Sequence, residues 1–532
     1  MSAESELLVL TQQLEELNRI GAALSAERNT GRLLELILTK ARTITNSDAG
    51  SLYVVESVPQ DDSPDLRKPP TDHEAPFKRL RFTVAQNDSV SLPFREGLLD
   101  ITGHSIAGYV ALTGDIVMLD DAYEVPKNVP YVFNRSFDEA AGYRTRSVLA
   151  VPMRAPKGHI VGVLQLINTK RNEDVITYSA SQSALVVSLA SQAAVALENS
   201  QLYAEIRQLF EGFVRASVVA IEARDPATSG HSFRVANLTV ALAEAADRAD
   251  SGPLAQVKFS GDDLRTIRYA ALLHDFGKVG VREEILVKAK KLHPSQIDQV
   301  RERFRLARRT LEWSAAQAQL NFVLAHGTAA YRERLSAFDA ELQTGLARLE
   351  EQLAEVERAN EPTVLADGTF DRLREIAAAT FDDIDGTARP MLREDEVQWL
   401  SLRKGSLSER ERQQIEAHVV HTYRFLRQIP WTSEIRRLPA IALGHHEKLN
   451  GSGYPYKLSA PDIPVQTRMM TISDIFDALS ASDRPYKKAV PVERALDILG
   501  GEVKDGALDA DLFDLFVEAR VYDRWLVEPH PY

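Results

Sequence analysis

The stretch Ala271-Leu272-Leu273-His274-Asp275-Phe276-Gly277-Lys278 places an adjacent histidine and aspartate directly after an apolar helical turn. Imidazole and carboxylate side chains can converge on metal ions where the backbone is held rigid, and one carboxylate can bridge two ions. A His-Asp dipeptide alone is a weak signal, because a buried histidine is more often a hydrogen-bonded core residue. A metal site therefore requires further ligands from elsewhere in the chain.

Further histidines and an aspartate stand on both sides of this stretch. His231 precedes it, and His418, the doublet His445-His446 and Asp474 follow it. The chain has 12 histidines and no cysteine, so any metal site must use imidazoles and carboxylates. Each of these residues alone is more often a packed, hydrogen-bonded core residue than a metal ligand.

Together with Gly453-Tyr454-Pro455 and Arg484-Pro485-Tyr486-Lys487, this order resembles the HD-GYP family, the branch of HD-domain phosphohydrolases that hydrolyses cyclic di-GMP. The resemblance runs from about residue 210 to residue 516 and is interrupted once. It implies seven metal ligands, which are His231, His274, Asp275, His418, His445, His446 and Asp474, with Asp275 bridging two ions. Five imidazoles with two carboxylates suit iron, manganese or another borderline divalent metal better than magnesium or calcium. It also implies substrate contacts, with phosphate held by Lys278, Arg484 and Lys487 and one cleft wall formed around Tyr454.

The resemblance implies a two-metal phosphodiesterase. Two ions about 3.5–4 Å apart can activate water and polarise a phosphodiester, while Lys278 and Arg484 neutralise charge on the phosphoryl group. Some relatives hold a third metal through a glutamate four residues before the first ligand histidine, and that position here is Ala227. We therefore expect two divalent ions, iron or manganese, and hydrolysis of cyclic di-GMP to linear pGpG, with further cleavage to GMP left open. The alternatives are a dinucleotide receptor with little turnover, and a phosphohydrolase for another cyclic dinucleotide or nucleotide.

Residues 29–182 show an α+β pattern. Short β-branched runs at 49–55, 116–119, 147–153 and 162–168 predict strands of one sheet. Through Asp48-Ala49-Gly50-Ser51-Leu52-Tyr53, the run 106–114 and Gln165-Leu166-Ile167-Asn168, this segment resembles a GAF domain, a sensor of small ligands. Asn168-Thr169-Lys170 matches only part of the motif of cyclic-nucleotide-binding members, and the lack of cysteine excludes a thioether-linked chromophore. An unknown small-molecule ligand and a GAF domain without ligand both stay open.

Two helical segments carry narrow apolar seams. In residues 1–28 the seam comprises Leu7, Leu10, Leu14, Leu17 and Leu24, and in residues 183–220 it comprises Leu202, Ile206, Leu209, Phe213, Ala216 and Ala220. Steps of three and four residues are typical of a two-helix seam, so we predict a homodimer with a coiled-coil-like connector. The N-terminal helix could equally fold onto its own domain.

Residues 221–532 form the predicted HD-GYP domain, which a helical insertion at about 298–403 interrupts. Two amphipathic stretches, Phe304 to Phe322 and Leu335 to Val356, predict a hairpin of antiparallel helices. The arginine-rich run 301–309 could contact RNA or a partner, although a solvated helix face is the favoured interpretation. The insertion could also cap the cleft.

Composition sets the remaining expectations. Hydrophobic residues are 44% and charged residues 26% of the chain, which excludes wholesale disorder. The net charge of −13 argues against a nucleic-acid-binding role. The N-terminus lacks the features of a signal peptide, and no apolar run approaches the ~20 residues that span a bilayer. We expect a cytoplasmic multidomain protein without a membrane or nucleic-acid partner, in which a coiled-coil-like helix joins an α+β GAF-like sensor to an all-α HD-GYP domain.

Overall fold

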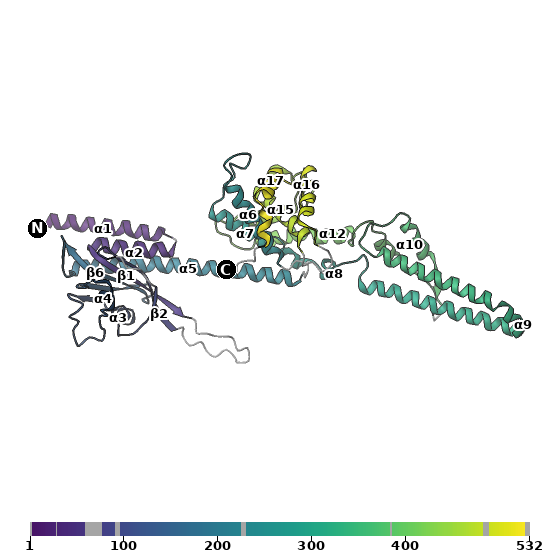
Figure 1. The fold of residues 1–532 in the computed structure, drawn as a ribbon, viewed down its shortest axis with the longest axis horizontal. Helices are drawn as coiled ribbons and strands as arrows, with labels where there is room; N and C mark the ends of the chain where they lie inside the picture. The colour runs from purple at the N-terminus through teal and green to yellow at the C-terminus, as the bar shows by residue number, and fades with distance from the viewer. Residues whose placement is uncertain are drawn as a thin grey trace. The chain divides into compact units, whose positions relative to one another are not determined.

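Figure 1 shows a computed structural model of the chain. The structure describes residues 3–27, 29–58, 77–90, 96–224, 230–383, 386–481 and 489–526. The chain divides into two compact units, Met1–Phe210 and Glu211–Tyr532.

An antiparallel sheet organises the first unit. Its strands are β1 (Ser47–Val58), β2 (Phe77–Asn87), β3 (Gly97–Asp100), β4 (Val117–Leu119), β5 (Val148–Arg154) and β6 (Ile160–Arg171), in the order β3-β2-β1-β6-β5-β4, with β7 (Asp174–Val175) paired to β6. The four strands predicted from sequence are confirmed as β1, β4, β5 and β6. The proline-rich, charged sequence of residues 58–78 predicts a loop between two strands, and most of it, residues 59–76, lies outside the described part of the chain.

Helices cover both faces of this sheet (Figure 1). On one side lie α1 (Ala3–Ala26), α2 (Thr30–Thr45) and the first part of α5 (Ala180–Arg224), and on the other lie α3 (Ile106–Thr113) and α4 (Ser136–Ala141). The first face packs through fully buried side chains such as Ile37, Leu164 and Leu189. A second core forms against α3, and a cavity of about 840 Å³, whose lining includes Tyr53 and Gln165, lies on that side.

The N-terminal helix folds onto its own domain over the part whose side chains are described. Leu17, Ile20 and Leu24 are buried in the core that α1 shares with α2 and α5. The prediction that Leu17 and Leu24 form a dimer seam is therefore wrong, because these side chains are already covered within the chain. The side chains of Leu7, Leu10 and Leu14 lie outside the described part.

The predicted connector seam lies on the exposed face of α5. Leu202, Ile206 and Leu209 are 48%, 61% and 76% exposed, whereas Val214 and Val218 on another face are buried. Exposure of an apolar stripe in the single chain is compatible with a partner helix. The coiled coil and the homodimer stay predictions.

The same helix contains an apolar window that the sequence analysis overlooked. Among the described helices, α5 alone has a window long and apolar enough to cross a membrane, by length and composition only. Within this helix Val186, Leu189, Ala193 and Leu197 are fully buried in the core of the first unit. Packing within the first unit accounts for these four residues, whereas 39% of the window as a whole is buried.

The second unit is mostly helical. Its helices outside the insertion are α6 (His231–Asp247), α7 (Gly261–Leu273), η2 (Phe276–Gly280), α8 (Glu283–Leu286), α12 (Glu409–Glu416), α13 (His418–Leu426), α14 (Leu438–Leu443), η3 (Ala460–Asp462), α15 (Val465–Ser480), α16 (Val492–Lys504), α17 (Ala510–Glu518) and η4 (Val521–Leu526). Leu242 of α6, Ile267 of α7, Phe476 of α15 and Phe516 of α17 meet in one core. These helices surround the predicted metal ligands.

The insertion forms a subdomain with its own core. It comprises α9 (Pro294–Ala359), α10 (Thr369–Ala378), β8 (Thr380–Asp382), β9 (Ala388–Pro390) and α11 (Glu394–Leu400), which pack around Val300, Phe304, Val356 and Leu373. The short paired strands β8 and β9 are a small β element within an otherwise helical domain, so the predicted all-α class is confirmed. Gly386, with φ 76°, adopts the left-handed conformation that a tight turn between two strands requires.

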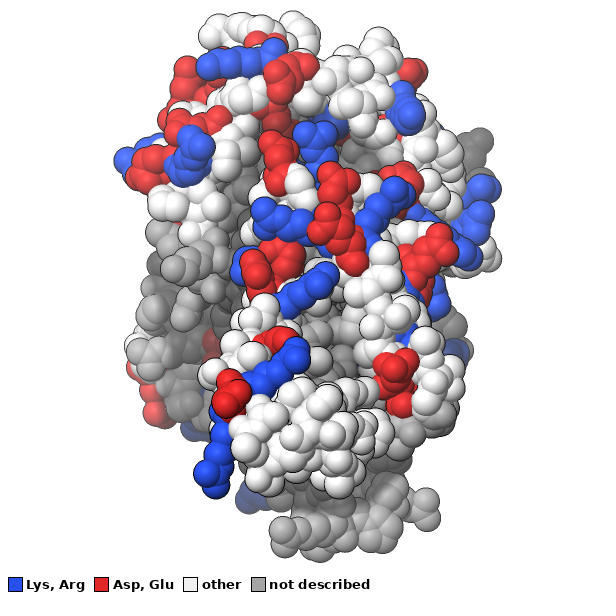
Figure 2. All heavy atoms as spheres, turned by 90° about the vertical axis from the view of Figure 1, so that its right-hand side faces the viewer, with Lys and Arg blue, Asp and Glu red and all other residues white. Residues whose placement is uncertain are grey.

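The predicted antiparallel hairpin is confirmed within α9, which reverses direction at Gly327 (Figure 1). Arg301 pairs with Glu357 at 2.8 Å and Arg308 with Glu350 at 3.1 Å, so the two arms run in opposite directions. Other arginines of the 301–309 run also contact carboxylates. Figure 2 shows basic and acidic side chains interspersed over the face turned to the viewer, as on a solvated helix surface.

Lys291, at the start of the insertion, is a buried cation whose removal should stabilise the fold. Its side chain is 0% exposed, and Nζ donates one hydrogen bond, to the carbonyl of Leu400 at 3.2 Å. Burial lowers the pKa of Lys291 from 10.5 to about 8, because a low dielectric disfavours the charged form.

We expect Lys291→Met to raise the free energy of unfolding at pH 7 by about 1–3 kcal/mol. The folded-state pKa is depressed, so the cost of burying the cation is full below about pH 8 and fades as the pH rises toward the unfolded value of 10.5. The advantage of the variant should therefore shrink between pH 7 and pH 10, which thermal melting of both proteins would measure. A lower melting temperature for Lys291→Met at pH 7 would contradict this expectation.

Candidate metal centre

All seven predicted metal ligands converge in the second unit. They come from five places in the chain: His231 begins α6, His274 and Asp275 follow α7, His418 begins α13, His445 and His446 follow α14, and Asp474 lies within α15. Six of the seven form two groups, His231-His274-Asp275 and His418-His445-His446, and within each group the potential ligand atoms lie within 4.8 Å of one another. All seven side chains are buried except His446, whose side chain is 28% exposed.

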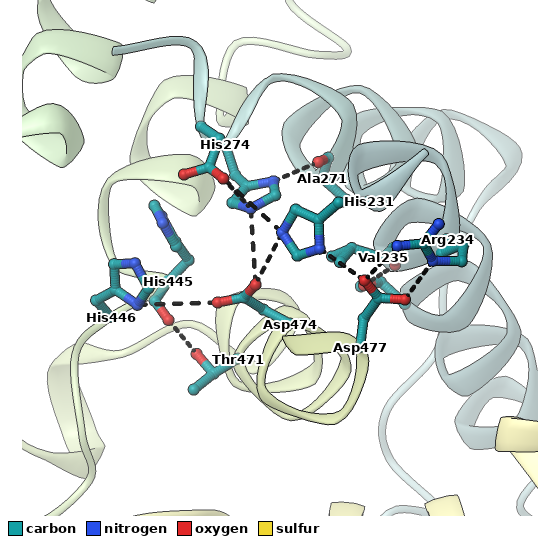
Figure 3. A network of polar contacts seen from close by, with 12 residues as sticks. His231, Arg234, Val235, Ala271, His274, His445, His446, Thr471, Asp474 and Asp477 are labelled. Carbon is teal, nitrogen blue, oxygen red and sulfur yellow. Dashed lines mark hydrogen bonds and ion pairs between the residues drawn. The ribbon is translucent and has the colours of Figure 1, made fainter. Parts of the chain in front are cut away.

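Two carboxylates lie between the two groups. Asp275 Oδ1 lies 3.2 Å from His418 Nε2, and its Oδ2 lies 3.4 Å from His274 Nε2 and 3.8 Å from His231 Nε2. Asp474 spans them in the same way, with Oδ1 at 3.2 Å from His231 Nε2 and Oδ2 at 3.8 Å from His446 Nδ1 (Figure 3). Each carboxylate therefore presents one oxygen to each group, as a bridging ligand between two ions requires.

Helix ends orient three of the imidazoles. Nδ1 of His274 lies 2.7 Å from the Ala271 carbonyl, Nδ1 of His418 lies 2.7 Å from that of Ile415, and Nδ1 of His445 lies 2.6 Å from that of Ala442. The last carbonyls of a helix lack an intrahelical partner, so they are free to accept this Nδ1–H. Such a bond leaves the lone pair on Nε2, which faces the site in each case.

One buried atom indicates directly that the site suits a cation. Nε2 of His274 is buried and has no hydrogen-bond partner within the described part of the chain. An unpaired polar atom in a buried position carries a free-energy cost, unless a bound group satisfies it. A divalent ion among imidazole and carboxylate donors fits that position.

The imidazoles fall into two kinds by the direction in which their pKa values are shifted. Burial lowers the pKa of His274, that of His446 to about 4, and that of His445 well below its usual range. These rings are neutral at neutral pH and can offer lone pairs. In His231 burial also lowers the pKa, but hydrogen bonds to Asp474 and Asp477 outweigh it and raise the pKa to about 9. A metal ion must therefore displace a proton from His231.

The carboxylates remain ionised in spite of their burial. Burial raises the pKa of Asp275, but Lys278, whose Nζ lies 2.9 Å from Oδ2, and the neighbouring histidines hold it well below the usual range. The pKa of Asp474 is likewise lowered against the effect of burial, chiefly by the hydrogen bond from His231. Two negative charges are thus available for bound cations.

The structure describes two of the four predicted substrate contacts, Lys278 and Tyr454. Lys278 lies at the edge of the cluster beside Asp275, and the ring of Tyr454 packs on His446 with centroids 4.8 Å apart. Burial raises the pKa of Tyr454, so its hydroxyl stays protonated. Arg484, Lys487 and Ala227 lie outside the described residues.

Two residues to which the sequence analysis gave no role stabilise the site. The hydroxyl of Thr422 on α13 accepts a hydrogen bond from Gly277 N–H at 2.8 Å and donates one to the His274 carbonyl at 2.9 Å. Glu447, which is buried, accepts from the backbone N–H groups of Tyr456 and Leu458 and so shapes the loop around Tyr454. Glu447 could have been singled out from the sequence because it directly follows the His445-His446 doublet. No feature of the sequence around Thr422 indicated its role.

Comparison with known protein families agrees with this architecture. A GAF-domain model matches residues 29–197, and two HD-domain models match residues 228–366 and 395–512. The chain thus carries a GAF domain followed by HD-domain segments, which confirms the predicted order of domains.

Three of the relatives that match segments of the chain are phosphodiesterases of cyclic dinucleotides. The chain is 39% identical over 111 residues to the 3'3'-cGAMP-specific phosphodiesterase 3 of Vibrio cholerae, covering 21% of this chain and 23% of that protein. It is 39% identical over 95 residues to a cyclic di-GMP phosphodiesterase of Thermotoga maritima, covering 18% of this chain and 25% of that protein. It is 49% identical over 59 residues to the cyclic di-GMP phosphodiesterase response regulator RpfG of Xanthomonas campestris pv. campestris, covering 11% and 15%.

The aligned segments span about a quarter or less of the length of these curated relatives. Among solved structures, the GAF domain of an Acinetobacter phosphoenolpyruvate-protein phosphotransferase is similar, with 16% identity, a TM-score of 0.25, and coverage of 38% of this chain and 97% of that one.

Proposed function

We propose that this protein is a metal-dependent phosphodiesterase that hydrolyses a cyclic dinucleotide, with cyclic di-GMP converted to linear pGpG and, optionally, to GMP. The observation that supports it most strongly is the convergence of seven buried or half-buried side chains into two groups that Asp275 and Asp474 join. The named relatives act on cyclic di-GMP or 3'3'-cGAMP and support the substrate class.

In this proposal His231 and His274, with Asp275 and Asp474, would hold one divalent ion. The same two carboxylates, with His418, His445 and His446, would hold the second. Two such ions, iron or manganese, would supply an activated water and polarise the phosphodiester. The chain's own residues exclude bulk water by burial, orient the imidazoles through their Nδ1 bonds, and set Lys278 beside Asp275, where its charge can offset that of a phosphate.

Other parts of the proposal concern segments away from the metal centre. Arg484 and Lys487 are proposed as further phosphate contacts, and Tyr454 as a wall of the substrate site. The GAF domain is proposed to regulate the HD region in a homodimer formed through residues 202–220, in the cytoplasm. A ligand for its cavity is not identified.

The test is turnover by the full-length protein, purified without oxygen, with metal counted in the same sample. We expect about two ions per chain and conversion of cyclic di-GMP to its linear dinucleotide. 3'3'-cGAMP is assayed in parallel, because relatives of both specificities exist. Two ions per chain without turnover of either substrate would favour the receptor, and absence of bound metal would contradict the proposal.

A further inference from the structure

His231 differs from the other buried imidazoles of the site in how its ring is oriented. His274, His418 and His445 each place Nδ1 against the carbonyl three residues earlier, at the end of a helix. His231 is instead the first residue of α6, so no turn of that helix precedes it. Another group must therefore fix its ring.

That group is Asp477, on α15. Its Oδ2 lies 2.7 Å from His231 Nδ1, and its carboxylate is 0% exposed. Arg234, one turn after His231 on α6, donates to Asp477 from Nε to Oδ1 at 2.6 Å and from Nη2 to Oδ2 at 3.1 Å. Figure 3 shows the three side chains in a row, with Asp474 on the opposite edge of the His231 ring.

We propose that Asp477, held by Arg234, is a positioning residue that keeps the proton of His231 on Nδ1 and its Nε2 lone pair directed at the His274-Asp275 group. This inference rests on the proposed function, since it assumes that His231 binds a metal ion. A carboxylate can only accept from Nδ1–H, so it selects one of the two imidazole tautomers. The bidentate contact from Arg234 fixes the plane of the carboxylate and with it the plane of the ring.

The isosteric change Asp477→Asn separates this role from simple packing. An amide can donate to Nδ1 as well as accept from it, so the tautomer with the proton on Nε2 becomes accessible, and that proton occupies the position of the metal. Loss of a group that orients a metal-binding histidine costs about 10–100-fold in metal affinity. Only the ion held by His231 should be affected.

The experiment titrates manganese into the metal-free full-length protein. We expect about two ions in the wild type, and in Asp477→Asn one ion bound with about 10–100-fold weaker affinity while the other is unchanged. Arg234→Gln, which keeps the carboxylate of Asp477, should weaken the binding of the same ion by a smaller factor. This variant tests the inference if Asp477→Asn does not fold. Ser480→Ala is the matched control, because Ser480 is buried on the same helix and its hydroxyl donates to the Phe476 carbonyl.

A double-mutant cycle provides the decisive readout. If Asp477 acts through His231, adding Asp477→Asn to His231→Ala should change neither metal affinity further. Equal losses at both ions, or a similar loss in Ser480→Ala, would show a structural role and overturn the inference. Unchanged binding in Asp477→Asn, beside a wild type with two ions, would overturn it while leaving the proposed function intact. A wild type without bound metal would overturn both.

Discussion

Replacing His274 and Asp275 together with alanine is expected to abolish metal binding and phosphodiesterase turnover at once. Asp275 presents one oxygen to each of the two histidine groups, so its loss removes a ligand from both proposed ions. Turnover should fall on the order of 10³-fold or more, because residues that act together in catalysis lose most of their joint effect when any one of them is removed. Metal content per chain and turnover, measured on one sample, check this.

His421→Ala is the control for that experiment. His421 lies on α13, three residues after His418, but belongs to neither group of candidate ligands. It should keep two ions per chain and wild-type turnover. The first unit should stay folded in both variants, because its core contains none of the changed residues. Unchanged turnover in the double alanine variant would refute the assignment of the site.

Gly277→Ala is expected to have the second largest effect. A Cβ atom at Gly277 would lie 1.9 Å from the carbonyl oxygen of His418 and 2.5 Å from the backbone nitrogen of Thr422. Both are backbone atoms of α13 and cannot move without displacing that helix. Overpacking typically costs 1–3 kcal/mol and more where the backbone must shift, so we expect about 3 kcal/mol or more of lost stability.

The same change should weaken metal binding, because it separates His274 and Asp275 from His418. The hydrogen bonds of Thr422 to Gly277 and His274 would be disrupted at the same time. Gly280→Ala is the matched control in the same 3₁₀ helix, since the atoms nearest to its Cβ would belong to the side chain of His421, at 3.3 Å and beyond. Thermal melting and metal counts on both variants test this, and a Gly277→Ala protein as stable as Gly280→Ala would contradict the proposed close contact.

The identity of the candidate ligands could be predicted from sequence because each is a particular side-chain type in a particular order. His231, His274-Asp275, His418, His445-His446 and Asp474 are distinctive when read together, and the structure brings all of them into one site. The hydrophobic periodicity was equally informative for the α9 hairpin, since the ends of its two arms, with Phe304 and Val356, pack into one core. Periodicity failed for α1, because a stripe of leucines does not specify which surface covers it.

Only the tertiary structure shows what orients these ligands. The partner of His231, Asp477, is 246 residues away in sequence, and Thr422 reaches His274 across 148 residues. The sequence also does not predict that the carbonyls of Ala271, Ile415 and Ala442 accept these Nδ1 hydrogen bonds. Every residue has a carbonyl, and only those at the end of a helix lack an intrahelical partner. Sequence therefore determined which side chains can bind metal, while the packing of α6, α7, α13 and α15 decided where their lone pairs point, because that depends on hydrogen bonds between distant segments.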